Sequence, residues 1–134
     1  MMQPLLRAAA AAAALAGLAG PAAALDLNSF RAQHKLPRLS VSSELSGAAY
    51  AHAHDLANRG RLDHAGFRQR LGNISSTAAE NVAYGCATEE CVIKMWARSA
   101  GHRRNMLMKG VSRYGIASAT SGNGRTYWVL ELGN

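Results

Sequence analysis

The chain is poor in cysteine, in acidic residues and in runs of like charge. Its two cysteines, Cys86 and Cys91, are too few for a zinc site built on cysteine alone, and no histidine lies near them in sequence. Its 15 basic residues outnumber its 8 acidic residues, but apart from Arg103-Arg104 they are spread singly. The balance favours anionic partners, whereas the lack of a Lys/Arg run argues against nucleic acid as a partner.

Long apolar runs are also missing. The Ala/Leu/Gly run over residues 8–20 is shorter than the roughly 20 residues of a membrane-spanning helix. It follows Arg7 and precedes Pro21 and three alanines, which is typical of a secretory signal peptide with a small-residue cleavage site. We predict a signal peptide over residues 1–24, with an uncleaved membrane anchor as the alternative. The remainder, 25–134, is then one secreted domain, periplasmic or extracellular, that is a monomer and not an integral membrane protein.

Export would place the two cysteines in an oxidising compartment. Cys86 and Cys91 enclose a short loop just before a helical pattern. A bond between them would stabilise the fold by about 2 kcal/mol in the loop-entropy description. We therefore predict a disulfide, with two free thiols as the alternative, and a paired Cys86 and Cys91 would leave no cysteine nucleophile.

Hydrophobic periodicity, caps and turn residues predict three helices and three strands. The helices are expected over 27–34, from 45 to a stop at Gly60, and from 88 to a stop at Gly101. The strands are expected over 81–85, 114–119 and 126–132, with a hairpin loop at 121–124 and an irregular segment over 61–77. Helices first and a hairpin last predict an α+β domain with helices packed on a mainly antiparallel sheet.

The five histidines are the first candidates for a site. We expect His34 at the surface. His52 and His54 lie two apart on a helix and point in different directions, so we expect at most one to face a site and favour neither. His64 and His102 stand in polar stretches beside helix ends, and Glu80 stands just before a strand. If these three converge, they would make a divalent-metal or acid–base site.

Three segments of the chain carry a recognisable pattern. They are Asp63-His64, the run AENVAYG over residues 79–85 and the run WARSAGHRRNML over residues 96–107. They resemble the S-H, G-E-N-I-A-Y-G and W-x-x-S-x-G-H-R-x-N-I-L signatures of bacterial members of the CAP superfamily, the cysteine-rich secretory, antigen 5 and pathogenesis-related proteins that share the SCP domain. Matches at 27–31, 36–39, 114–117 and 127–128 extend the resemblance over essentially the whole of 25–134.

The resemblance implies a three-layer α-β-α sandwich of the PR-1-like type, with an open cleft. In the family, two histidines and one or two acidic residues line that cleft, and His64, Glu80 and His102 stand at these positions. The resemblance implies that His64 and His102 can take up zinc or another divalent ion, with Glu80 orienting an imidazole or a water. Ser99 and Asn81 are the other residues expected at the cleft.

Two positions depart from the family pattern. Ala79 replaces a glycine, and Asp63 replaces a serine. The second cleft glutamate of the larger eukaryotic members is also missing, with Ser99 near its place. The site thus has few anionic ligands, which predicts that a metal ion is held weakly. We expect Asp63 to be a solvated loop residue rather than a ligand.

Three functions remain open for this cleft. The first is a binding module for a small molecule, a lipid-like ligand or an envelope polymer, although Trp96 and Trp128 are expected in the core rather than in a lipid groove. The second is a metal-assisted peptidase or envelope-polymer hydrolase with Glu80 as base. Two protein ligands are fewer than the three usual for catalytic zinc, and no H-E-x-x-H is present. In the third, the cleft is structural, with charged hydrogen bonds worth about 1.5–3 kcal/mol each.

Overall fold

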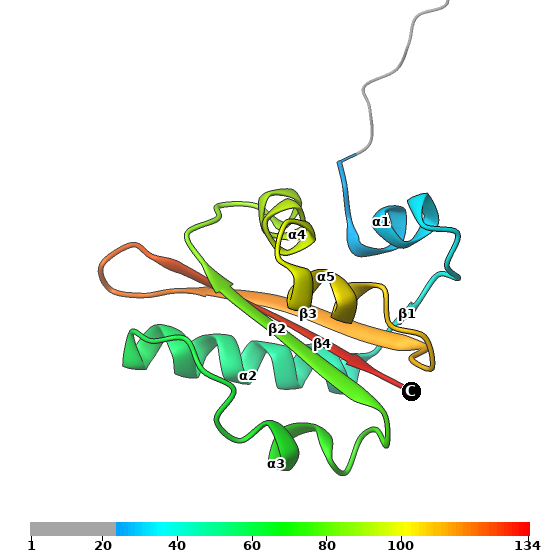
Figure 1. Ribbon diagram of the computed structural model, residues 1–134. Helices are drawn as coiled ribbons and strands as arrows, with labels where there is room; N and C mark the ends of the chain where they lie inside the picture. The colour runs from blue at the N-terminus through cyan, green and yellow to red at the C-terminus, as the bar shows by residue number, and fades with distance from the viewer. Residues whose placement is uncertain (1–23) are drawn as a thin grey trace, which may run out of the picture.

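The computed structural model describes residues 24–134 as four strands and five helices. The signal-peptide prediction falls almost entirely on residues 1–23, which lie outside the described residues. The strands are β1 (Ser40–Val41), β2 (Ala78–Tyr84), β3 (Arg113–Thr120) and β4 (Thr126–Gly133), and they form one sheet in the order β1-β3-β4-β2 (Figure 1). Only the short pairing of β1 with β3 is parallel, so the prediction of a mainly antiparallel sheet is confirmed.

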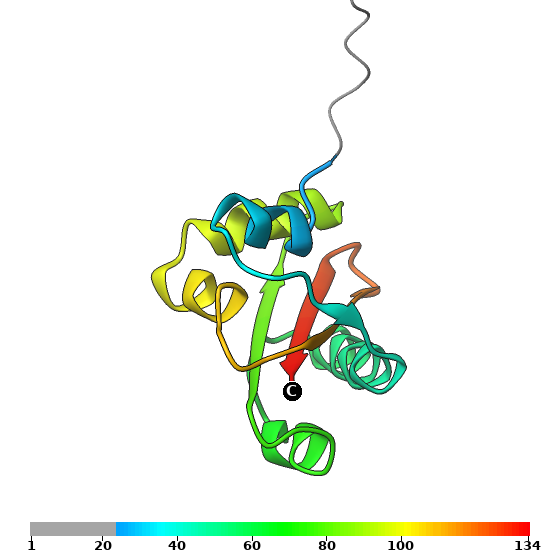
Figure 2. The same cartoon turned by 90° about the vertical axis from the view of Figure 1, so that its right-hand side faces the viewer.

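The helices cover both faces of this sheet. They are α1 (Leu27–Gln33), α2 (Ser43–Arg59), α3 (Phe67–Leu71), α4 (Glu89–Ala97) and α5 (Ala100–Met106). Helix α2 lies on one face, and α1, α4 and α5 gather on the other, as the edge-on view in Figure 2 shows. The α-β-α sandwich is therefore confirmed. No helix among residues 24–134 is long and apolar enough to cross a membrane.

Two hydrophobic clusters hold the layers together, one on each face of the sheet. On the α2 face, Ala49, Ala53 and Leu56 pack against Val129 and Tyr127 of β4. The small side chains of α2 allow a close approach, and a Cβ at Gly115 of β3 would stand only 2.2 Å from the backbone nitrogen of Ser46. The opposite cluster contains both tryptophans, and their predicted place in the core is confirmed.

Strand alternation places every second residue of β2 and β4 on the same face. Val129 and Glu131 face α2, and Leu130 and Leu132 face the other layer, as their hydrophobic clusters indicate. By the same alternation Glu80 shares the α2 face with Glu131, whereas Asn81 faces α5. Because β2 is an edge strand, residues of both layers can meet around it.

Three local predictions need correction. Gly101 does not end a helix: α4 stops at Ala97, and Gly101 lies in the first turn of α5. The segment 61–77, predicted to be irregular, contains α3. Strand β2 begins at Ala78, so Glu80 lies within the strand and not before it.

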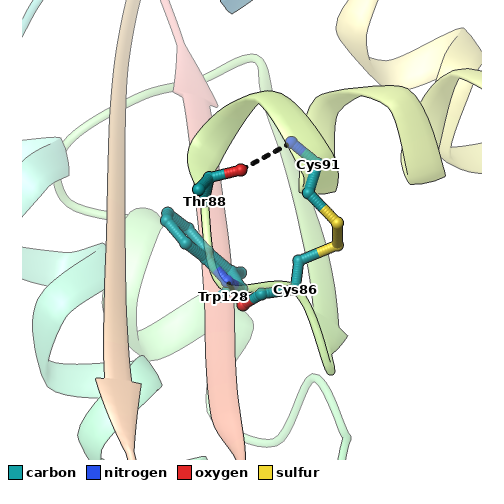
Figure 3. Close-up of a disulfide and its surroundings, with 4 residues drawn as sticks. All are labelled: Cys86, Thr88, Cys91 and Trp128. Atoms are coloured by element: carbon teal, nitrogen blue, oxygen red, sulfur yellow. Dashed lines mark hydrogen bonds between the residues drawn. A yellow bond between two sulfur atoms is a disulfide. The ribbon is translucent and has the colours of Figure 1, made fainter.

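The predicted disulfide between Cys86 and Cys91 is confirmed (Figure 3). It joins the start of the β2–α4 turn to the first turn of α4. The hydroxyl of Thr88 caps that helix by accepting a hydrogen bond from the Cys91 backbone N–H at 3.2 Å. The indole N–H of Trp128 donates to the Cys86 carbonyl at 2.8 Å, which ties the turn to β4.

Candidate functional site

The candidate site is built around Glu80, a buried acid on the edge strand β2. Its cross-strand partner on β4 is Glu131, so two carboxyl groups stand side by side on the face that α2 covers. Glu80 is 5% exposed and Glu131 is 0% exposed. Two acids buried next to each other can be tolerated only if a cation or a shared proton reduces their charge.

The cation is Arg70, supplied by α3. Its Nη2 lies 2.6 Å from Oε2 and 2.8 Å from Oε1 of Glu80, and its Nε lies 3.2 Å from Oε2. The same Nε is 3.5 Å from Oε1 of Glu131. Residues 61–77 therefore do more than connect α2 to β2, because α3 carries the counter-ion of the two acids.

The proton is held by Glu131. Within residues 24–134, no donor makes a hydrogen bond to either of its carboxyl oxygens, and its remaining neighbour is the carboxyl group of Glu80. Burial, together with the hydrogen bond and the charge of Glu80, raises the pKa of Glu131 to about 10. Burial acts in the same direction on Glu80, but hydrogen bonds from Glu131, Arg70 and His64 outweigh it and lower the pKa of Glu80. At neutral pH Glu80 is thus the charged acid of the pair and Glu131 the neutral one.

Two histidines meet this carboxylate. Nδ1 of His64 lies 2.8 Å from Oε1 of Glu80, so Nδ1 carries the hydrogen and Nε2 is left as the second ring nitrogen. The His64 side chain is 54% exposed. His52 is buried, and its Nε2 lies 2.8 Å from the backbone oxygen of Asp63 and 3.6 Å from Oε1 of Glu80. Of the pair His52 and His54, His52 is thus the one that faces the site, and it fixes the backbone next to His64.

His102 approaches β2 from the opposite layer. The Asn81 side chain donates to the His102 backbone oxygen at 3.0 Å and accepts from Asn105 at 2.9 Å. Among residues 24–134, no hydrogen bond is made by the ring nitrogens of His102. Burial, with a contribution from the charge of His64, lowers the pKa of His102, so its ring is neutral at neutral pH. His64 and His102 thus contact neighbouring residues of β2, Glu80 through a ring nitrogen and Asn81 through a backbone oxygen.

The other predicted residues are placed differently. The Asp63 carboxylate accepts from Arg59 at 2.7 Å and lies 3.3 Å from Nε of Arg61, so it is engaged away from Glu80. Arg59 and a backbone N–H hold the pKa of Asp63 far below its usual range. Ser99 is the N-cap position of α5, but its hydroxyl makes no capping bond. Asn81 is 0% exposed and positions α5 rather than facing solvent.

The sequence profile of the cysteine-rich secretory protein family, CAP, matches residues 26–132. The chain belongs to this family. It is 31% identical to the protein YkwD of Bacillus subtilis over an alignment of 104 residues, which covers 72% of this chain and 40% of that relative. The chain thus spans less than half the length of this curated relative.

Solved structures support the same fold. An outer surface protein of Borrelia burgdorferi matches with a TM-score of 0.72 and 18% identity, covering 81% of this chain and 86% of that one. An extracellular protein with an SCP domain from Bacillus anthracis matches with a TM-score of 0.69 and 21% identity, covering 79% and 37%. A cysteine-rich secretory protein of Staphylococcus aureus matches with a TM-score of 0.64 and 23% identity, covering 79% and 35%.

In this CAP domain, three charged or titratable residues of the site escaped the sequence reasoning: Arg70, Glu131 and His52. Glu131 had a usable signal, since an acid alternating with Val129 on the last strand must face the same buried layer. Arg70 had none, because α3 is too short for a periodic pattern. His52 shares the buried stripe of Ala49, Ala53 and Leu56, which would have placed it inward.

Proposed function

We propose that this CAP domain is a secreted binding module in which His64 and His102 hold a divalent metal ion, weakly and with positions open to a small ligand. One observation carries the proposal. The hydrogen bond of Nδ1 of His64 to Glu80 leaves Nε2 free on a half-exposed ring, and the neighbouring residue Asn81 holds the backbone of a neutral His102 whose ring nitrogens are unbonded among residues 24–134. Carboxylate–histidine pairs of this kind orient metal-binding imidazoles in many proteins.

The donor set fits a borderline ion such as zinc, which accepts neutral imidazole nitrogen. Among the described residues, no group of three or more His, Cys, Asp or Glu side chains is arranged to hold a metal. Two protein ligands fall short of the four of a structural zinc site and the three of most catalytic ones. When bound, such an ion would offer its open positions to an oxygen or nitrogen donor of an external ligand. We therefore expect weak binding.

The charge state of Glu80 favours binding over hydrolysis. A general base works best with a pKa near the working pH and with a free lone pair facing the reacting water. The oxygens of Glu80 are taken by Arg70 and His64, and the pKa of Glu80 is lowered rather than raised. Its supported task is to fix the hydrogen on Nδ1 of His64 and to hold that ring in place.

The test is zinc titration by calorimetry, combined with thermal unfolding. We expect saturable binding of one zinc ion to the native protein. His64→Ala and His102→Ala should each abolish it, whereas the matched control His54→Ala, at an exposed histidine of α2, should bind like the native protein. Glu80→Gln should weaken binding by about 10–100-fold, the usual effect of removing a residue that orients a metal ligand.

Thermal unfolding separates the metal-binding role from a purely structural one. We expect His64→Ala to unfold within a few degrees of the native protein in the absence of zinc, because its side chain is half-exposed. Zinc affinity that survives in the His64→Ala/His102→Ala double variant would contradict the proposal. So would a native protein that binds no zinc while the double variant loses much of its stability, which would assign the histidines a structural role alone.

A further inference from the structure

Arg31 of α1 is a buried cation that has no counter-ion among residues 24–134. The residue as a whole is 2% exposed. Nε donates to the Pro37 carbonyl at 3.0 Å, and Nη1 donates to the carbonyls of Met106 and Met108 at 3.0 and 2.9 Å. Burial lowers the pKa of Arg31, and no acidic neighbour offsets this effect. Among residues 24–134, the charge is thus balanced by carbonyl dipoles alone.

The guanidinium has hydrogen-bonding capacity to spare. Arginine carries five N–H donors in a planar fork. Three of them are used by the carbonyl groups of Pro37, Met106 and Met108. The two on Nη2 donate to no residue of the described part of the chain. The planar fork of the guanidinium matches the geometry of a carboxylate.

The same residue lines a groove of about 260 Å³, between the segment that follows α1 and the turn that precedes β3. The other lining residues are Leu36, Pro37, Lys109, Gly110 and Val111. The walls are mainly apolar, and the one further charge is the Lys109 ammonium, which has no ion-pair partner among residues 24–134. The volume lies slightly below the roughly 300–1,000 Å³ typical of drug-sized ligands.

From this arrangement we propose that the groove binds a small organic carboxylate, with its anionic group on Nη2 of Arg31 and its short apolar chain against Leu36, Pro37 and Val111. Lys109 adds a second positive charge at the rim. An alcohol or an amine of the same shape lacks the anion that the fork requires. An inorganic phosphate supplies the anion but buries no apolar surface. The groove does not include His64 or His102, so this site is independent of the proposed metal site.

The test is a titration of the isotope-labelled native protein by two-dimensional NMR, with 4-methylpentanoate as the probe. We expect saturable shifts of the Arg31 side-chain N–H signals and of the backbone amides at Leu36, Lys109 and Gly110. The isosteric alcohol should bind at least about tenfold more weakly, because a charge-assisted hydrogen bond is lost. Shifts confined to other surfaces, or equal affinity for the acid and the alcohol, would overturn the proposal.

Variants localise the effect. Lys109→Gln should weaken carboxylate binding several-fold, and the charge-matched control Lys94→Gln, on the exposed face of α4, should leave it unchanged. Leu36→Trp should fill the groove and abolish binding without removing any charge. If Arg31→Lys fails to fold and so cannot be tested for carboxylate binding, Lys109→Gln and Leu36→Trp still test the site. An unchanged carboxylate affinity in Leu36→Trp would contradict the proposed site. A native protein that binds no carboxylate would also contradict it, and Arg31 would then have a purely structural role.

A second pair of probes identifies the source of the carboxylate. A tripeptide ending in leucine carries the same group as 4-methylpentanoate, on a longer chain. Binding of the free-acid tripeptide, but not of its C-terminal amide, would assign the groove to peptide ends. Binding of 4-methylpentanoate alone would assign it to free short-chain acids. Binding of the amide as tightly as of the free acid would contradict the need for an anion.

Discussion

The two sides of the edge strand β2 position histidines by different chemistry. On the ionic side, which we define as Glu80, Glu131, Arg70, His52 and His64, a charged carboxylate sits between a guanidinium and an imidazole. On the amide side, which we define as Asn81, Asn105 and His102, neutral side-chain amides hold the backbone of α5. The ionic side fixes a ring nitrogen of His64 directly, whereas the amide side fixes only the backbone of His102.

This difference has a physical consequence. Removing one charged group from a buried network leaves its partner as an unpaired buried charge, which is costly. Removing a neutral amide leaves at most one hydrogen-bonding group unsatisfied. The ionic side should therefore be the more fragile one and should respond to pH. The hydrogen bonds of Asn81 and Asn105 on the amide side should be less fragile and should not respond to pH, since they reach only the backbone of His102. Substitutions on either side can break or sharpen this contrast.

The largest effect is expected from Arg70→Met. The change keeps much of the side-chain volume but leaves Glu80 as a buried charge without its cation. We expect the free energy of unfolding to fall by about 3–5 kcal/mol, the usual cost of removing one partner of a buried ion pair. Denaturant unfolding measures it. Arg68→Met, at an exposed arginine of the same helix, is the control, and an equal loss in the two variants would contradict a central role for Arg70.

A pH-dependent effect is expected from Glu131→Gln. The native state keeps the proton of Glu131 up to about pH 10, whereas the ordinary pKa is 4.5. Between these values the native state holds one more proton than the unfolded chain, so native stability is lost as pH rises. The Gln variant lacks this proton.

Relative to that of the native protein, the free energy of unfolding of Glu131→Gln should therefore rise by up to about 1.4 kcal/mol per pH unit between pH 6 and pH 8. Denaturant unfolding at several pH values measures the gain. Glu90→Gln, at an acid on the surface of α4 that pairs with Lys94, should show no such gain. Parallel stability curves for the native protein and Glu131→Gln would contradict the shared proton.

The smallest effect is expected from Asn81→Ala on the amide side. Loss of its hydrogen bonds to His102 and Asn105 should cost about 1–3 kcal/mol. Because no titrating group takes part, the loss should be the same at pH 6 and pH 8. Unfolding of Asn58→Ala, at an exposed asparagine of α2, provides the control. A strongly pH-dependent loss in Asn81→Ala would show that the two sides are coupled rather than distinct.

The sequence predicted the amide side and the ionic side unequally. Asn81 and His102 stand in long motifs, as does Glu80 of the ionic side, so family resemblance pointed to these three, and periodicity located α4 and the hairpin of β3 and β4. The ionic side depends on contacts between residues far apart in the chain. Arg70 reaches Glu80 only because α3, a five-residue helix, folds against the edge of the sheet, and no periodic signal announces so short an element.

His52 shows a second limit of sequence reasoning. Its separation of two from His54 predicted rings that point in different directions, and they do: His54 packs on Tyr50, whereas His52 is buried. Histidine spacing within one helix could not reveal that the loop carrying Asp63 and His64 returns over His52. The ligand of the site likewise cannot be predicted from a sequence pattern, because its identity depends on which side-chain groups face solvent at the site in the folded protein.

The most direct measurement of the central claim is the nitrogen-15 NMR spectrum of the five histidines, recorded before and after addition of zinc. Before zinc, we predict that His64 carries its hydrogen on Nδ1 and that His102 is neutral at pH 7. With zinc, Nε2 of His64 and a ring nitrogen of His102 should shift together, while His34 and His54 stay unchanged. A His64 ring protonated on Nε2, or zinc shifts that bypass His64 and His102, would contradict the proposed site.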